Sequence, residues 1–275
     1  MLHRITAPAP PPLSRRSLLR LGAAAAGLLA APRALRAEGD SPAETLHRPR
    51  LRLPATTANG ARVPVTVEAA YSMEPDHGGS VLEVVNPRDP VAPKGVFHFT
   101  PANGRPWVAF QARFDEGPSS VVATAQCSRH GRFSATTPLV IAPGGGGCAG
   151  GAPATPAGAD EEIRPPVIRI PRLVAEGTLL ADELIQVQVK TRHPNRTGLV
   201  LREGRWVAES EPFHLSSLEV VYADEPVSRF VLTAALSDNP LITFLLRARR
   251  EGMVRVTLTN TRGRRFEASH PIRFA

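Results

Sequence analysis

The chain has 275 residues, of which 42% are hydrophobic, 5% aromatic and 21% charged, and its formal net charge is +8. Residues 1–37 hold six of the 33 basic residues and no acidic one, so the rest of the chain is nearly neutral. This balance argues against nucleic-acid binding, and the 28 prolines and 22 glycines favour short strands joined by turns.

Residues 1–37 have the pattern of an export signal. Arg15 and Arg16 precede a weakly apolar stretch over 18–31, and small residues follow up to Ala37. That stretch is shorter than the ~20 residues of a membrane span, and the paired arginines resemble a twin-arginine signal. We therefore expect export to the periplasm by the twin-arginine route and no membrane span. A disordered basic tail is the alternative.

The first half of the chain is predicted to be a β-sandwich. Residues 38–60 are polar and proline-rich, and we expect them to form a leader. From Val63 onward, apolar residues alternate with polar ones, which predicts half-buried strands. Asn103-Gly104 predicts a turn between two of these strands. We expect an antiparallel, immunoglobulin-like sandwich over 61–142.

The second half is predicted to be a similar sandwich. Residues 143–165 lack periodic apolar residues and are predicted to be a flexible Gly/Ala/Pro linker. Alternating strands return over 166–275, and we also interpret "NPLITFLLRARREG" as a strand, although it fits a helical stripe. The predicted fold class is therefore all-β, with two sandwich domains joined by the linker.

The two cysteines are expected to differ. Cys127 shares one strand face with Val121, Ala123 and Ala125, which predicts a core position. A disulfide to Cys148 is the alternative. Cys127-x-x-His130 is an isolated pair of ligand-type residues, so we predict no metal site there and no cofactor.

Cys148 is predicted to be an exposed thiol on a mobile arm. Its neighbours have little or no side chain, so they can neither bury nor activate it. A partner enzyme would have to supply the chemistry, which suits a carrier rather than an enzyme; we predict no catalytic residue. The predicted arm consists of Gly144, Gly145, Gly146, Gly147, Ala149, Gly150 and Gly151 around the cysteine.

Several stretches resemble the SoxY and SoxZ families of bacterial sulfur-oxidation carriers. "RVPVTVEAAY", "FHFTP" and "GGGGCAGG" resemble SoxY, whose Gly-Gly-Cys-Gly-Gly arm carries sulfur intermediates. "VIRIPRLVAEGTLLADELIQVQVKTRHPNRTGL" and "DNPLITFLLRARREGMVRVTLTNTRG" resemble SoxZ, including Thr191, His193, Pro194, Thr197 and Gly198. The chain is thus identified as a SoxY–SoxZ fusion in which the two domains pair within one molecule.

The resemblance implies a mechanism without catalysis by this chain. A c-type haem enzyme couples thiosulfate to the cysteine, a metal-dependent hydrolase releases sulfate, and a sulfur dehydrogenase oxidises what remains. Only Cys148 carries over as the attachment residue. The arm of the two-chain family is a free C-terminus, whereas here it is internal, and Ala149 replaces a glycine. Fused carriers of this kind also resemble a group associated with periplasmic quinoprotein dehydrogenases, so a carrier or adaptor for such an enzyme is the alternative function.

For two histidines we expect ordinary structural positions. His98 lies between Phe97 and Phe99 in an alternating run, so we expect it to face solvent. His193 precedes Pro194 and is interpreted as a turn residue.

Overall fold

The structure is a computed structural model that describes residues 42–74, 78–149 and 163–275. The predicted signal over 1–37 lies outside the described residues, as do most of the linker, Gly150 and Gly151. None of the helices within the described ranges has the length and apolar character of a membrane span.

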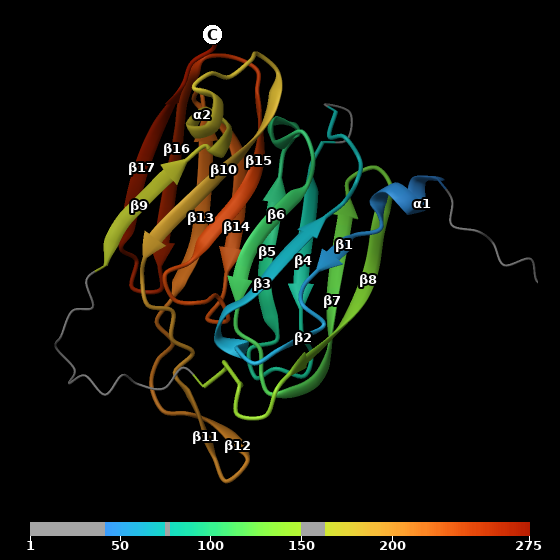
Figure 1. Cartoon of the computed structure of the whole chain (residues 1–275), viewed down its shortest axis with the longest axis vertical. Helices are drawn as coiled ribbons and strands as arrows, with labels where there is room; N and C mark the ends of the chain where they lie inside the picture. Colours follow the sequence, from blue (N-terminus) through green and yellow to red (C-terminus); the bar gives the residue numbers. More distant parts are fainter. Residues whose placement is uncertain (1–41, 75–77, 150–162) are drawn as a thin grey trace, which may run out of the picture. The chain divides into compact units, whose positions relative to one another are not determined.

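The regular structure of the described residues is nearly all strand, with only short helices between the strands, which confirms the all-β prediction (Figure 1). The strands before the linker are β1 (Arg50–Arg52), β2 (Thr56–Thr57), β3 (Val63–Glu68), β4 (Ser80–Val85), β5 (Pro93–Phe99), β6 (Trp107–Ala112), β7 (Gly117–Cys127) and β8 (Gly131–Ile141). Those after it are β9 (Arg164–Arg169), β10 (Glu183–Arg192), β11 (Leu199–Arg202), β12 (Arg205–Ala208), β13 (Leu215–Tyr222), β14 (Glu225–Leu232), β15 (Leu241–Ala248), β16 (Gly252–Asn260) and β17 (Arg265–Ile272). The short helices are α1 (Pro42–His47), α2 (Pro171–Glu176), η1 (Gly60–Arg62) and η3 (Pro101–Asn103).

Both large sheets take strands from both halves of the chain. The six-stranded sheet has the order β1-β3-β6-β15-β10-β9, and the nine-stranded sheet has the order β17-β16-β13-β14-β5-β4-β7-β8-β2. The halves meet where β5 pairs with β14, from Phe99↔Ser228 to Gly95↔Leu232, and where β6 pairs with β15. The halves therefore share continuous sheets instead of standing as two bodies on a tether.

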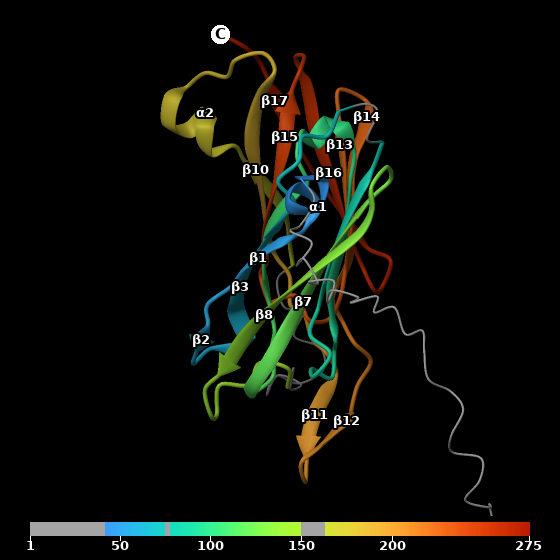
Figure 2. The ribbon, with the colours of Figure 1, turned by 90° about the vertical axis from the view of Figure 1, so that its right-hand side faces the viewer.

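One hydrophobic core lies between the two sheets (Figure 2). Where the halves meet, Phe97 of β5 lies 4.9 Å, ring centroid to centroid, from Phe110 of β6 and 5.2 Å from Phe230 of β14. Phe230 in turn lies 5.8 Å from Phe244 of β15, edge to face. Aromatic pairs at these distances contribute about 0.5–1.5 kcal/mol each beyond their burial, so the junction is part of the core.

The segment 38–60 differs from the predicted leader. From Pro42 it is ordered: it forms α1, then β1, which pairs with β3, and then β2, which pairs in parallel with β8. Leu51 is buried while its neighbours in β1 are exposed, so even this three-residue strand alternates. The strand is too short for periodicity to reveal it.

In two short segments, a glycine with positive φ sets the local backbone. Gly104 has φ 70°, as the predicted Asn103-Gly104 turn requires, and the buried Asn103 side chain donates to Leu245 O (2.7 Å) and Ser228 Oγ (2.9 Å) across the junction. In the second half, where alternating strands are predicted from residue 166, β9 ends at Arg169 and gives way to α2. Pro171 at the first turn and Gly177 at φ 75° after the last are the usual end residues of a helix.

Candidate functional site

Cys148 lies on a docked segment, which corrects the prediction of an exposed, mobile arm. We call residues 144–149 the arm. Gly145 accepts a hydrogen bond from the Gly60 amide (2.7 Å), and the Gly147 amide donates to Phe114 O (2.8 Å). The Phe114 amide donates back to Gly60 O (2.8 Å), so the arm is held against η1 and the segment after β6.

The glycines of the arm are needed for close packing. A Cβ on Gly147 would lie 2.2 Å from Gly60 C and 2.3 Å from Ala61 N, and a Cβ on Gly145 would lie 2.4 Å from Ala58 O. All three atoms belong to the backbone and cannot rotate away. The run of glycines predicts a flexible arm, but here the missing side chains allow the backbone of the arm to pack directly against the backbone of residues 58–61.

The Cys148 side chain is fully buried, at 0% exposure. Burial raises its pKa to about 12; of the nearby charges, Lys94 and Arg113 lower the pKa while Asp89 and Asp115 raise it. The thiol is therefore protonated at neutral pH in this conformation, and a protonated thiol is a poor nucleophile. Cys127 is buried as predicted, and both cysteines are free thiols, so the alternative of a disulfide between them does not hold here.

A buried ion pair lies among the charges that act on the thiol. Lys94 Nζ is 2.6 Å from Asp89 Oδ2, donates to Val91 O (2.8 Å) and lies 4.7 Å from the centroid of the Phe114 ring. Asp89 Oδ1 accepts from the Asp115 amide (3.0 Å). Because breaking a buried pair by removing one partner costs about 3–5 kcal/mol, these contacts fix the segment 113–116 on which the arm rests.

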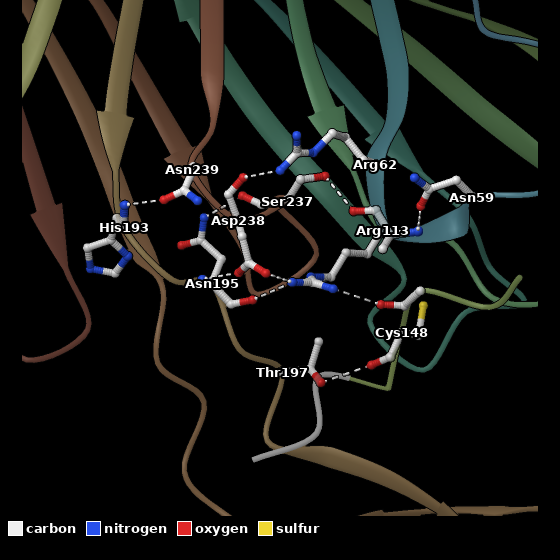
Figure 3. Close-up of polar contacts among 12 residues, drawn as sticks. Asn59, Arg62, Arg113, Cys148, His193, Asn195, Thr197, Ser237, Asp238 and Asn239 are labelled. Carbon is white, nitrogen blue, oxygen red and sulfur yellow. Dashed lines mark hydrogen bonds and ion pairs between the residues drawn. The ribbon is translucent and has the colours of Figure 1, made fainter. Parts of the chain in front are cut away.

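One residue from each half of the chain holds the carbonyl groups on either side of the cysteine side chain (Figure 3). Thr197 Oγ1 donates to Cys148 O (2.9 Å), and Arg113 Nη1 donates to Gly147 O (3.1 Å). Arg113 Nη2 also donates to Asn195 O (3.1 Å) and pairs with Asp238 Oδ2 (2.8 Å). We call Arg113, Asn195, Thr197 and Asp238 the arm clamp. It joins the end of β6 to two loops of the other half.

Asn195 orders the loop that carries Thr197. Its side chain donates to Ser237 O (2.7 Å) and accepts from the Leu215 amide (2.9 Å), while its amide donates to Asp238 Oδ1 (2.7 Å). Asn195 is fully buried, so each of these bonds replaces one to water. The sequence motif around Thr197 is predicted to matter only through its resemblance to SoxZ, but one of its side chains, that of Thr197, contacts the arm.

His193 is a core residue, so the interpretation as a plain turn residue is incomplete. It is 0% exposed, its ring lies 4.9 Å from that of Phe213, and Asn260 Nδ2 lies 3.3 Å from its Nε2. Burial lowers its pKa to about 4, so the ring is neutral at pH 7. His98 is exposed on β5, as expected.

An open hollow of about 440 Å³ adjoins the arm clamp. Thr197 and Val91 both line it, and these residues also contact Cys148 and Lys94 respectively. The β11–β12 hairpin contributes Leu199 and Ala208 to the wall. A partner seated there would touch the groups that hold the arm.

Sequence reasoning missed the arm clamp and the buried ion pair. Arg113, Lys94 and Asp89 are charged residues in ordinary surface-like contexts, and no local pattern marks them as buried or marks Asp238 as the partner of Arg113. The resemblance around Thr197 was the one available signal. The predicted site residues Gly144 to Ala149 are brought together with these groups; the role of Cys148 in attachment stays a prediction.

Comparisons with known proteins match two families along this chain. Residues 36–148 match the model described as "Sulfur oxidation protein SoxY", and residues 175–271 match "Sulphur oxidation protein SoxZ". The first match ends at Cys148 and the second includes the loop of Asn195 and Thr197. No curated protein matches the chain. A superoxide reductase (neelaredoxin) from Ignicoccus hospitalis aligns with 41% of this chain and 82% of its own, at 19% identity and a TM-score of 0.29.

Proposed function

Because the chain belongs to the SoxY and SoxZ families of sulfur-oxidation proteins, joined in one polypeptide, we propose that it is a periplasmic sulfur carrier with Cys148 as the attachment residue. Export by the twin-arginine route is part of the proposal. The observation that carries it is the position of Cys148: a lone thiol on the arm, stored by contacts from both halves of the fold.

The stored conformation protects the thiol. Protonated and buried, Cys148 cannot react with small oxidants or with a second thiol in an oxidising compartment. The carrier must therefore release the arm before loading, and a partner enzyme that favours the released form would select it.

Release of the arm is energetically modest. Besides a local turn bond from the Gly145 amide to Ala142 O, four hydrogen bonds hold residues 145–148: two to the backbone of residues 60 and 114, one from Arg113 and one from Thr197. At about 0.5–1.5 kcal/mol net for each of the three neutral bonds and about 1.5–3 kcal/mol for the bond from Arg113, docking contributes about 3–7.5 kcal/mol. That range corresponds to a released fraction between about 1 in 150 and 1 in 300,000. Partner binding can supply a free energy of this size.

The loading step needs an oxidant. Cys148 thiolate and thiosulfate form a sulfur–sulfur bond, giving Cys148–S–S–sulfonate, and two electrons leave to a c-type haem partner. Water then attacks the sulfonate sulfur on a metal-dependent hydrolase, which releases sulfate and leaves a persulfide on Cys148. A sulfur dehydrogenase is the third proposed partner. This chain binds and presents the sulfur atoms and does no chemistry of its own.

Intact-mass measurement tests the proposal. The full mature chain is incubated with thiosulfate and a c-type haem enzyme that couples thiosulfate to carrier cysteines. We expect the mass of one thiosulfate group to be added to the wild type and to Cys127→Ser, and nothing to be added to Cys148→Ser. An adduct on Cys127, or no adduct on any variant, contradicts the proposal.

The alternative function, an adaptor for a quinoprotein dehydrogenase, makes a different prediction. An adaptor works through its surface, so Cys148→Ser would keep full activity in a coupled assay with the dehydrogenase. A carrier loses that activity, because nothing replaces the sulfur atom of Cys148.

A further inference from the structure

A second group of ligand-type side chains lies at the far end of the β7–β8 hairpin. Cys127 is the last residue of β7 and pairs in register with Gly131, the first residue of β8, so His130 lies in the connecting turn. The turn brings Cys127 Sγ to 3.6 Å from His130 Nδ1. The spacing Cys-x-x-His thus becomes a pair of adjacent donor atoms.

The fold adds a third donor from a distant part of the sequence. His47, the last residue of α1, lies with its ring 4.3 Å from that of His130 and stacks on Tyr71 at 4.2 Å. One ligand atom of His47, one of Cys127 and one of His130 all lie within 4.8 Å of one another. In the sequence, Cys127 and His130 are an isolated pair of donors, but in the fold His47 joins them as a third.

The spacing of these atoms fits a tetrahedral metal ion. Zinc–sulfur bonds of about 2.3 Å and zinc–nitrogen bonds of about 2.0–2.1 Å, at the tetrahedral angle, put the two ligand atoms about 3.6 Å apart. The Cys127–His130 distance of 3.6 Å has this value without any movement. The ligand atom of His47 lies within 4.8 Å of the other two, so at most a small movement is needed, which imidazole rotation supplies.

The donors also favour one class of metal. A thiolate and two imidazoles suit zinc and its neighbours, whereas calcium and magnesium require oxygen ligands. His47 and Cys127 are 3% exposed and His130 is exposed, so a fourth position can face solvent. Three protein ligands with an open fourth position bind a water or a small ligand.

We propose that His47, Cys127 and His130 form a binding site for a zinc-class ion, with solvent as the fourth ligand. The site is separate from the arm and does not depend on the carrier function. A bound ion would join α1, which precedes the sheets, to the β7–β8 hairpin, and so would hold the N-terminal segment in place.

Cobalt titration of the full mature chain tests the site. Cys148→Ser serves as the parent protein, because it removes the other thiol. We expect one equivalent of Co²⁺ to produce a thiolate-to-cobalt charge-transfer band, together with the intense visible bands of four-coordinate cobalt. One equivalent of Zn²⁺ should then remove both, and Zn²⁺ should raise the melting temperature of the parent.

Matched histidine variants distinguish the site from adventitious binding. His130→Asn, at an exposed position, should weaken Zn²⁺ binding by at least about a hundred-fold, since even indirect ligand partners contribute 10–100-fold. His98→Asn, at another exposed histidine, should bind like the parent. Cys127→Ser should lose the charge-transfer band and the rise in melting temperature. No band in the parent, equal binding by His130→Asn, or binding of Cu⁺ without Co²⁺ or Zn²⁺ would overturn the proposal.

Discussion

At the scale of single residues, Gly147 shows how a flexible sequence becomes an ordered arm. Its Cα hydrogen points at Gly60 and Ala61, where a methyl group would overlap backbone atoms. Gly146 beside it has a looser environment: the nearest atoms to its Cβ position are Asp115 Oδ1 at 3.2 Å, which a side-chain rotation can move, and Glu116 N at 3.3 Å, which needs a backbone shift of only a few tenths of an ångström. Gly147→Ala and Gly146→Ala are therefore a test variant and its matched control.

Gly147→Ala should release the arm while Gly146→Ala leaves it docked. We expect alkylation of Cys148 by iodoacetamide at pH 7 to be at least about ten-fold faster in Gly147→Ala, which corresponds to about 1.4 kcal/mol of lost docking. The rate in Gly146→Ala should stay within about three-fold of the wild type. Peptide mass spectrometry assigns the label to Cys148 or Cys127. Equal rates in the two variants would show that the close contact at Gly147 does not exist in solution.

His193 should make the fold sensitive to acid. Its folded pKa of about 4 lies below the unfolded value of about 6.5, so the unfolded chain binds the proton more tightly. The stabilisation is fully present above pH 6.5 and is lost as the pH falls from 6.5 toward 4. Between pH 7 and pH 5 the loss from this one group is about 2 kcal/mol.

Urea unfolding at the two pH values measures that loss. His193→Gln cannot be protonated, so its free energy of unfolding should fall less between pH 7 and pH 5 than that of the wild type. The exposed His98→Gln should fall as much as the wild type. A His193→Gln variant with the full wild-type pH dependence would mean that the ring already carries its proton when buried.

At the scale of elements, the arm lies between η1 and the loops of the second half, and Arg113 links them. Arg113→Ala removes the donors to Gly147 O and Asn195 O. It leaves no buried charge behind, since the Asp238 side chain is 46% exposed. Hydrogen bonds from charged groups contribute about 1.5–3 kcal/mol, so we expect alkylation of Cys148 to become about 10–100-fold faster.

Asp238→Asn is the control for Arg113→Ala. It removes the ion pair but leaves the two bonds from Arg113 to backbone carbonyls, so its effect on the alkylation rate should be clearly smaller. If Asp238→Asn accelerates labelling as much as Arg113→Ala, the ion pair holds the arm and the bond to Gly147 does not.

The long strands were predictable from sequence and the arm was not, for a physical reason. Alternation in β3 or β10 has one structural meaning, because a strand with one buried face must alternate. A run of glycines has two meanings: free backbone rotation and close backbone approach. Which one applies depends on residues such as Gly60 that come near only in the folded state. The burial of Lys94 and the arrival of His47 beside Cys127 likewise depend on long-range contacts that no local pattern records.

At the scale of the whole molecule, the shared sheets make global unfolding and release of the arm two separate motions. The β5–β14 pairing and the Phe97–Phe230 contact place the junction in the core, so the two halves should unfold together. The arm contributes few contacts to that core. Its release is therefore a local opening, which exposes little surface.

The most direct test of this account is the alkylation rate of Cys148 as a function of urea concentration below the unfolding transition, read by peptide mass spectrometry. We predict a rate far below that of the unfolded chain and nearly independent of urea until the transition, because local opening exposes little surface to the denaturant. A rate that rises from zero urea with the slope of global unfolding would contradict the account, since the thiol would then emerge only when the whole fold is lost.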